Sequence, residues 1–170
     1  MKKIHIIGLG LLGGSFALAL KQARPEIKFT GFDANSKNQE DALALGIIDE
    51  AKEEPDTDTD VIILATPANT LPTLLLKYLD QVGSNTLIID FGSTKENLCK
   101  TVTEHPKRAQ YLAGHPIAGT EYSGPKAAKA DLLDKKVFII CEMELTDVHL
   151  KGMAYDILEA LNMKLRFMDA

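Results

Sequence analysis

The segment Gly8–Ser15, GLGLLGGS, most constrains how this chain can fold, because it places four glycines directly after the apolar run Ile4–Ile7. A glycine inside a regular element costs roughly 0.5 to 1 kcal/mol relative to alanine, so four glycines here indicate a specific requirement of the backbone. Gly8, Gly10 and Gly13 have the spacing G-x-G-x-x-G. Between a strand and a helix, this spacing is typical of a turn that binds the pyrophosphate of a dinucleotide.

Each glycine of this turn has its own role in that interpretation. The first makes the tight bend, the second lets the backbone approach the pyrophosphate, and the third lets the helix pack closely on the strand. The pyrophosphate would lie against unpaired N–H groups at the helix start. Leu11 and Leu12 therefore join Gly8, Gly10 and Gly13 as candidate cofactor-binding residues.

An acidic residue follows at the spacing that such a turn requires. Asp33 lies 20 residues after Gly13, at the end of the second apolar run. Its carboxylate can accept hydrogen bonds from ribose hydroxyls and would repel a 2′-phosphate, so we expect NAD rather than NADP. Ser36 and Lys37 weaken that expectation, because a cation there could receive a 2′-phosphate. The alternative is that Asp33 is only a turn residue after a strand.

Apolar, β-branched runs alternate along the chain with segments of helical periodicity. This alternation predicts an α/β fold with right-handed crossovers: a doubly wound, mainly parallel, Rossmann-like sheet in one domain spanning residues 1–170. The expected strands are Lys3–Gly8, Ile27–Asp33, Asp60–Ala65, Thr86–Asp90, Tyr111–Ala113, Val137–Cys141 and Met163–Met168. The expected helices are Ser15–Ala23, Lys37–Leu45, Thr70–Val82, Thr94–Glu104 and Asp147–Leu161.

Polar residues follow three of the expected strands. Thr66 and Pro67 come after the third strand, and their backbone is a candidate lining of the cofactor site, although Pro67 could instead only begin the next helix. Ser93 and His115 follow the next two strands. Because the carboxyl ends of parallel strands meet at one edge, we expect these residues to converge where a nicotinamide ring would lie.

Ser93 and His115 differ in how strongly the sequence favours a chemical role. Ser93 with Glu96 three residues later also fits a capping box, so capping and catalysis are equal alternatives for this serine. For His115, the following Pro116 favours an extended backbone, and an imidazole is suited to accept a proton at neutral pH. The other histidines, His5, His105 and His149, are expected to be structural.

Composition excludes several classes of function. The net charge of −5 without a basic run argues against nucleic acid or an anionic membrane as partner. No stretch is apolar enough to span a membrane, and the glycines interrupt what would otherwise resemble a secretory signal at the N-terminus. Cys99 and Cys141 are far apart, which favours a reducing, cytoplasmic location. No spacing of ligand residues indicates a metal site.

The stretch Gly114–Lys136 interrupts the alternation of strands and helices. It contains His115, Gly119 and Gly124 among polar residues, and loops of this length in a compact domain are usually functional or disordered. Its conformation cannot be assigned from the sequence.

Several of these segments together resemble prephenate dehydrogenase, an enzyme family of tyrosine biosynthesis. The resemblance rests on the glycine turn, Asp33, the segment DFGSTK from Asp90 to Lys95 and, above all, GHPIAGTEYSG from Gly114 to Gly124. It runs along the whole chain. The pattern HPxxGxExSG is its most specific part, because generic dinucleotide-binding folds do not carry it.

The resemblance implies NAD-dependent oxidative decarboxylation of prephenate to 4-hydroxyphenylpyruvate. On the matching positions, His115 would accept the proton of the substrate 4-hydroxyl, and Ser93 would orient that hydroxyl and the nicotinamide. Glu121 falls on an acidic position of the family and would shape substrate binding rather than carry out chemistry. The alternatives are a dehydrogenase of arogenate (cyclohexadienyl dehydrogenase) and a non-catalytic NAD-binding module.

Family members continue into a helical second domain that forms the dimer and supplies an arginine for the substrate carboxylate. That domain is absent from this sequence, which stops at Ala170, and we therefore expect NAD binding with weak or absent turnover. Lys95, Lys126 and Arg108 are candidates for the missing anion-binding group, without any special spacing.

Overall fold

A computed structural model describes all residues from 1 to 170 and contains a single eight-stranded sheet in the order β3-β2-β1-β4-β5-β6-β7-β8. The strands are β1 (Lys3–Ile7), β2 (Lys28–Phe32), β3 (Glu50–Ala51), β4 (Val61–Leu64), β5 (Leu87–Asp90), β6 (Tyr111–Pro116), β7 (Val137–Cys141) and β8 (Lys164–Met168). The helices are α1 (Leu11–Ala23), α2 (Ser36–Ala44), α3 (Leu71–Gln81), α4 (Glu96–Val102) and α5 (Val148–Ala160), with short 3₁₀ turns at Arg108–Gln110, Pro125–Ala127 and Met143–Leu145.

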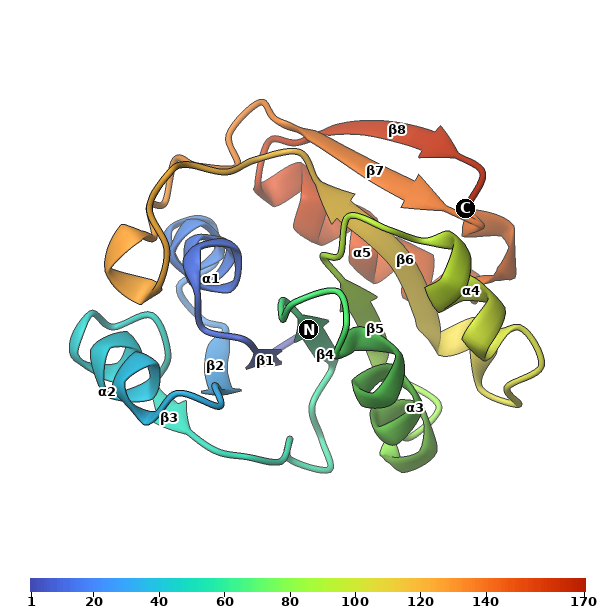
Figure 1. Cartoon of the computed structure of the whole chain (residues 1–170), viewed down its shortest axis with the longest axis horizontal. Coiled ribbons are helices and arrows are strands. Elements are labelled where there is room, and N and C mark those ends of the chain that lie inside the picture. Colours follow the sequence, from blue (N-terminus) through green and yellow to red (C-terminus); the bar gives the residue numbers. More distant parts are fainter.

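Helices cover both faces of this sheet, as expected for a doubly wound fold (Figure 1). Successive residues of a strand point to opposite faces, so β1 contributes to two separate hydrophobic clusters. Ile4 and Ile6 pack with residues of α1 and α5, whereas Ile7 packs with residues of α3 and α4. Every residue of β4 and β5 is buried, which explains why these strands read as continuous apolar runs. The expected Rossmann-like α/β fold is confirmed.

The order of the strands also determines where a ligand can bind. From β1 the chain builds outward to β2 and β3, and then returns to build β4, β5 and β6 on the other side. Ligands of such sheets bind at this reversal point, beyond the carboxyl ends of the strands. The glycine turn that follows β1 lies at this point.

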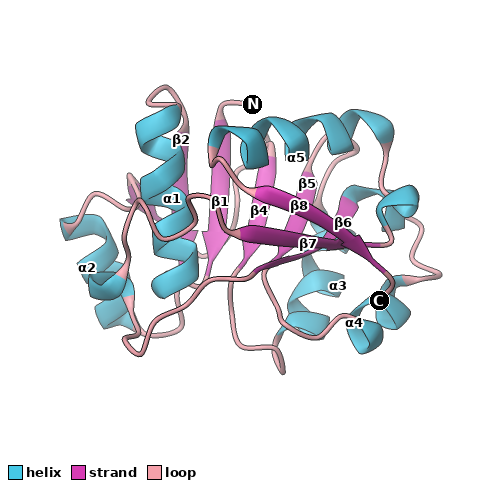
Figure 2. Cartoon of the chain, turned by 90° about the horizontal axis from the view of Figure 1, so that it is seen from above, coloured by secondary structure: helices cyan, strands magenta, loops and turns pink.

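The sheet departs from the sequence-based expectation at two strands, β6 and β3. The expected strand Tyr111–Ala113 continues to Pro116, because its last residues pair with β7 in antiparallel orientation, with His115 opposite Ile139. The short edge strand β3 was not expected, since two residues are too few to produce a periodic pattern. In Figure 2, β7 and β8 run at a large angle to β1 and β4, as the twist of a large sheet requires.

The segment between β6 and β7 leaves the sheet and crosses to the opposite side of the molecule. Figure 1 shows it passing to α1 and α2, where its 3₁₀ turn Pro125–Ala127 lies against both helices. The Ser15 hydroxyl of α1 accepts a hydrogen bond from the Lys129 amide at 3.0 Å, and Lys126 Nζ lies 3.4 Å from Asp41 of α2. The segment between β6 and β7, whose conformation the sequence did not predict, is thus held against α1, the helix that follows the glycine turn.

None of the helices combines the length and the apolar character needed to cross a bilayer.

His5 is a buried polar residue in the central strand. Its side chain is 0% exposed, and its Nδ1 lies 2.7 Å from the Thr30 hydroxyl on β2. Burial lowers the pKa of His5 from 6.5 to about 4, with nearby acidic residues such as Glu54 opposing that shift. The ring is therefore neutral in the folded chain, which fits its expected structural role.

His5 should make the fold sensitive to mild acid. Its folded pKa lies below its unfolded value, so its contribution is complete above pH 6.5 and is lost as the pH falls toward 4. The free energy of unfolding should decrease by up to about 3 kcal/mol over this interval. Urea titrations at several pH values measure this decrease, and His5→Leu should flatten the profile. An equally steep profile in this variant would show that other groups cause the acid sensitivity.

Candidate active site

The glycine turn brings the carboxyl end of β1 against the carboxyl end of β4. Gly8 has φ +96°, and a Cβ atom there would lie 2.5 Å from the Ala65 carbonyl oxygen, so only glycine fits. The Gly8 amide donates a hydrogen bond to the Phe32 carbonyl of β2 at 2.8 Å. This turn therefore joins the ends of three strands at one point.

Helix α1 begins immediately after this turn and leaves hydrogen-bond donors free. A Cβ atom on Gly13 would lie 2.1 Å from the Gly8 carbonyl oxygen, so this glycine permits the close packing of helix on strand. Gly14 is the first residue of the helix whose amide bonds to a carbonyl, that of Gly10, at 2.9 Å. The amides of Leu11 and Leu12 precede it, and Gly10 at the N-cap has no capping side chain.

The space around Gly10 fits a bound anion. A Cβ atom built on Gly10 would meet nothing within 4 Å, so the protein itself does not require glycine there. An open approach in front of free N–H groups at a helix N-terminus is what a pyrophosphate needs. The residues of this turn therefore fit a dinucleotide.

Asp33 lies at the end of β2, beside the glycine turn. Its carboxylate accepts hydrogen bonds from the Leu9 amide at 2.8 Å, the Asn35 amide at 2.9 Å and Asn38 Nδ2 at 3.1 Å. These three donors hold the carboxylate in one orientation while the side chain remains partly exposed. Asp33 is thus placed to present a fixed negative charge at the edge of the site.

Lys37, the cation that could have received a 2′-phosphate, forms ion pairs with acidic residues of α2. Lys37 Nζ lies 3.0 Å from Asp41 and 3.6 Å from Glu40, both on its own helix. Asp41 raises the pKa of Lys37 through a hydrogen bond and its charge. Lys37 is therefore paired with acids on α2 instead of standing free beside Asp33.

Thr66 and Pro67 lie at the carboxyl end of β4, next to Gly8. The Thr70 hydroxyl donates to the Pro67 carbonyl oxygen at 2.8 Å and lies 2.9 Å from Thr66 Oγ1, whose own proton can complete a second hydrogen bond, and these contacts order the turn. Helix α3 begins only at Leu71, so the alternative that Pro67 starts the helix is wrong. The turn leaves Pro67 exposed and Thr66 partly exposed at the ligand-binding edge.

His115 lies at the carboxyl end of β6 with a defined protonation pattern. Its Nδ1 is 3.1 Å from the carbonyl oxygen of Phe91, the residue that follows β5. A carbonyl oxygen can only accept, so Nδ1 carries the proton and Nε2 of the neutral ring keeps its lone pair. The half-buried imidazole thus offers a proton acceptor at the same edge as the glycine turn.

Ser93 lies two residues beyond Phe91, and the capping alternative for it is wrong. The N-cap of α4 is Lys95, no side chain caps this helix, and Glu96 instead pairs with Lys100 at 2.6 Å. The helix starts later than expected, which leaves Ser93 exposed in the turn after β5. Because Asp90 pairs with Ala113, the turn carrying Ser93 and the strand end carrying His115 are neighbours.

The candidates for an anion-binding group are all engaged in other contacts. Lys95 is buried and forms an ion pair with Asp90. Arg108 is buried and binds both the Tyr111 carbonyl and Glu142, each at 2.9 Å. Lys126, paired with Asp41 as described above, is exposed in the 3₁₀ turn that lies against α1 and α2. The sequence could not distinguish free from paired cations, because the partners of Lys95 and Arg108 come from other elements.

Two residues that the sequence analysis left without a role lie beneath this site. Tyr111 is fully buried, and its hydroxyl donates to Asp90 at 2.7 Å. Burial, together with the neighbouring Asp90, holds the pKa of Tyr111 well above its ordinary value. The only signal in the sequence was the unusual position of Asp90 at the end of an apolar strand.

Glu121 is exposed in the segment that leaves β6, together with the neighbouring Tyr122. The structure thus places this acid at the surface, beyond His115 along the chain.

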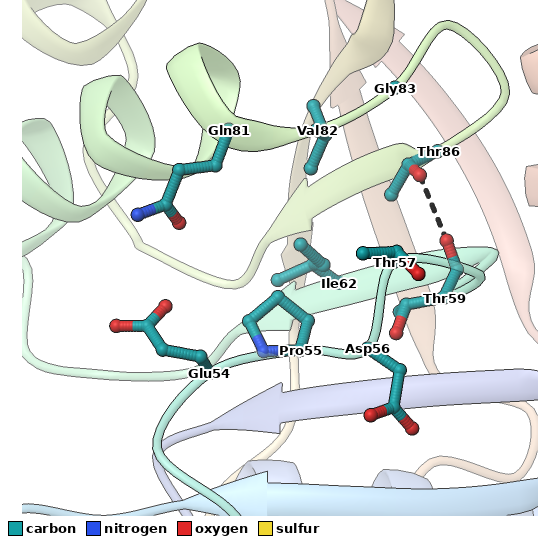
Figure 3. Close-up of a pocket in the computed structure, with 10 residues that line it drawn as sticks. All are labelled: Glu54, Pro55, Asp56, Thr57, Thr59, Ile62, Gln81, Val82, Gly83 and Thr86. Carbon is teal, nitrogen blue, oxygen red and sulfur yellow. Dashed lines mark hydrogen bonds between the residues drawn. The ribbon is translucent and has the colours of Figure 1, made fainter.

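A cavity of about 440 Å³ lies at the opposite edge of the sheet (Figure 3). It is lined by residues before β4 and around the end of α3, with Ile62 as an apolar wall and a hydrogen bond of 2.8 Å from Thr86 to the Thr59 carbonyl. Its acids, Glu54 and Asp56, are paired with lysines. The cavity is at the amino ends of the strands and is separate from the candidate active site.

Comparisons with known proteins agree with this geometry. Residues 16–167 match the family described as prephenate dehydrogenase, nucleotide-binding domain. Prephenate dehydrogenase of Lactococcus lactis is 36% identical over 164 residues, which cover 90% of this chain and 45% of that protein. The chain thus spans about half the length of the curated relatives that it matches.

Solved structures show the same relationship. Prephenate dehydrogenase from A. aeolicus, in complex with hydroxyphenyl propionate and NAD⁺, has a TM-score of 0.91 and 29% identity over 99% of this chain and 60% of its own. Synechocystis arogenate dehydrogenase has a TM-score of 0.86 and 25% identity over 98% of this chain and 59% of its own. The chain belongs to the prephenate dehydrogenase family and corresponds to the nucleotide-binding domain of its members.

Proposed function

We propose that this chain is the NAD-binding and catalytic-base domain of an enzyme that oxidatively decarboxylates prephenate. The observation that carries this proposal is the imidazole of His115, held by the Phe91 carbonyl at the edge where the glycine turn and Asp33 also lie. The reaction would remove a hydride from the ring carbon that bears the 4-hydroxyl, release carbon dioxide and leave 4-hydroxyphenylpyruvate. The family and the A. aeolicus complex support the choice of substrate and cofactor.

NAD⁺, when bound, supplies the hydride acceptor. The free amides of Leu11 and Leu12 would bind its pyrophosphate, with Gly10 leaving the approach open. Asp33 would accept hydrogen bonds from the ribose hydroxyls. Thr66 and Pro67 would line the path between this end and the nicotinamide.

His115 would act as the general base of the reaction. Its Nε2 lone pair can take the proton of the substrate hydroxyl, which becomes acidic as the hydride departs and a carbonyl forms. A positioned base typically contributes 10² to 10⁴ in rate. Ser93, with its hydroxyl exposed, would orient the substrate hydroxyl and the nicotinamide, and Glu121 would shape access to the site.

The chain alone should bind NAD⁺ but turn over prephenate weakly or not at all. Each candidate cation near the site is already paired, so no free group compensates the substrate carboxylates. The resemblance assigns that role to an arginine of a helical second domain, which also forms the dimer. Full family rates from these 170 residues would contradict this part of the proposal.

Arogenate is the second candidate substrate, because the Synechocystis relative is an arogenate dehydrogenase with a similar structure. Arogenate carries an amino group where prephenate carries a keto group. NADH fluorescence with each substrate would separate the two, and an absence of NADH with both, even after the helical second domain of a family member is added, would favour a non-catalytic NAD-binding module. The two buried free thiols, Cys99 and Cys141, are compatible with the cytoplasm as the proposed location.

Asp33 should make the site select NAD⁺ over NADP⁺. Repulsion between the carboxylate and a 2′-phosphate is worth roughly 1 to 4 kcal/mol at about 4 Å, so the affinity for NAD⁺ should exceed that for NADP⁺ by about fivefold or more. Isothermal titration of Asp33→Ser should show a smaller ratio. Asp131→Ser, which removes an exposed acid after the 3₁₀ turn at Pro125–Ala127, is the matched control and should keep the ratio of the unmodified chain.

Substitutions at two glycines of the turn should distinguish an effect on stability from an effect on NAD⁺ binding. Gly13→Ala should lower the free energy of unfolding by several kcal/mol, because its Cβ would overlap the Gly8 carbonyl. Gly10→Ala should change it by less than about 1 kcal/mol, since nothing surrounds the new methyl group, yet it should weaken NAD⁺ binding at least tenfold. Chemical denaturation and titration calorimetry measure the two effects. Full NAD⁺ affinity in Gly10→Ala would argue against the proposed pyrophosphate position.

His115→Asn should affect chemistry much more than cofactor binding. We expect the rate of NADH formation in single turnovers, with the chain in excess over prephenate, to fall at least 10²-fold, and NAD⁺ affinity to change less than twofold. His149→Asn, at an exposed histidine of α5, is the control and should match the unmodified chain. Equal and measurable rates of NADH formation in the two variants would eliminate His115 as the base.

A further inference from the structure

A single buried carboxylate connects the two segments that carry Ser93 and His115. Asp90 at the end of β5 is 0% exposed and accepts four hydrogen bonds. Its donors are the Tyr111 hydroxyl at 2.7 Å, the Gly92 amide at 2.9 Å, the Gly114 amide at 3.3 Å and the ammonium group of Lys95. Both oxygens of the carboxylate are used in this way.

These donors belong to the parts of the chain that form the candidate active site. Gly92 immediately precedes Ser93, and Gly114 immediately precedes His115. One oxygen of Asp90 holds the turn after β5 through Gly92 and Lys95, and the other holds β6 through Tyr111 and Gly114. The carboxylate therefore fixes how far the serine turn lies from the histidine strand.

The hydrogen bond that orients His115 depends on the same contact between segments. Phe91, whose carbonyl accepts from Nδ1 of His115, stands between Asp90 and Gly92 in the chain. If β6 moved relative to the end of β5, this bond of 3.1 Å would lengthen and the preference for a proton on Nδ1 would disappear. The lone pair would then no longer be confined to Nε2.

Stability alone is a poor explanation for this polar cluster. A buried ion pair loses hydration, and well-packed apolar residues of similar size are often at least as stable. Asp90 and Lys95 nevertheless lie buried beside the hydrophobic cluster that contains Leu98, Cys99 and Tyr111. Burial raises the pKa of Cys99 to about 12, so that thiol remains neutral.

Resting on the function proposed above, we infer that Asp90 is a positioning residue for the reaction. Through Tyr111, Gly92 and Gly114 it sets the tautomer of His115 and the place of the Ser93 hydroxyl, without touching substrate or cofactor itself. Residues that hydrogen-bond to the segments carrying the reacting groups can hold those groups in a precise geometry without contacting the substrate.

The test compares two buried tyrosines. Tyr111→Phe removes a donor to Asp90 but keeps the ion pair with Lys95, so the chain should still fold. Tyr78→Phe removes a hydroxyl from the same hydrophobic cluster, on α3, and is the matched control. Nitrogen-15 spectra of the histidine rings report the tautomer, and hydrogen exchange reports the amides of Gly92 and Gly114.

In Tyr111→Phe, we expect a mixture of His115 tautomers and at least tenfold faster exchange of both amides, whereas Tyr78→Phe should match the unmodified chain in both measurements. Asp90→Asn should produce the same changes more strongly. If Asp90→Asn does not fold, the result for Tyr111→Phe alone tests the inference. An unchanged tautomer in Tyr111→Phe, with stability lowered as in Tyr78→Phe, would reduce Asp90 to a structural residue and overturn the inference.

These spectra require neither substrate nor turnover, so they separate the inference from the proposed function. If the unmodified chain forms NADH from prephenate, Tyr111→Phe should lower the single-turnover rate at least tenfold and change NAD⁺ affinity less than twofold. If the unmodified chain forms no NADH even after the helical second domain of a family member is added, while the tautomer still depends on Tyr111, the assignment of the reaction fails and the positioning of His115 by Asp90 stands. If the tautomer is independent of Tyr111, the inference fails whatever the activity.

Discussion

The parallel alignment of β1, β4, β5 and β6 is the constraint on which the candidate site depends. It brings the glycine turn, Thr66, Ser93 and His115 to one edge, although more than a hundred residues separate the first from the last. Two close contacts hold this edge together. Gly8 lies against the Ala65 carbonyl at one end, and the carboxylate of Asp90 joins the turn after β5 to β6 at the other.

Charges near this edge follow a simple division. Free N–H groups and the positive end of α1 lie on one side of the glycine turn, and the carboxylate of Asp33 lies at the end of β2 beside it. The cations that could compete, Lys37 and Lys95, are held by Asp41 and Asp90. Neither lysine is therefore left unpaired beside the glycine turn or Ser93.

Much of this arrangement could be predicted from the sequence. Continuous apolar runs identified β4 and β5 because both faces of these strands are buried. The glycine spacing located the turn before α1, because sterics permit only glycine at Gly8 and Gly13. The start of α4 was misplaced, because Ser93 and Glu96 have the spacing of a capping box but face solvent and Lys100 instead. A sequence pattern of four residues cannot show whether these side chains cap the helix or have other partners.

The sequence by itself determined the order of strands and helices, the position of the dinucleotide turn and the candidates Asp33, Ser93 and His115, since these follow from periodicity and short-range sterics. Only the tertiary structure decided which nitrogen of His115 carries the proton, which lysines are free, and that Asp90 and Tyr111 support the site. The reason is physical: a hydrogen bond or ion pair forms between groups at a distance of about 3 Å in space, and many of the partners here lie far apart along the chain.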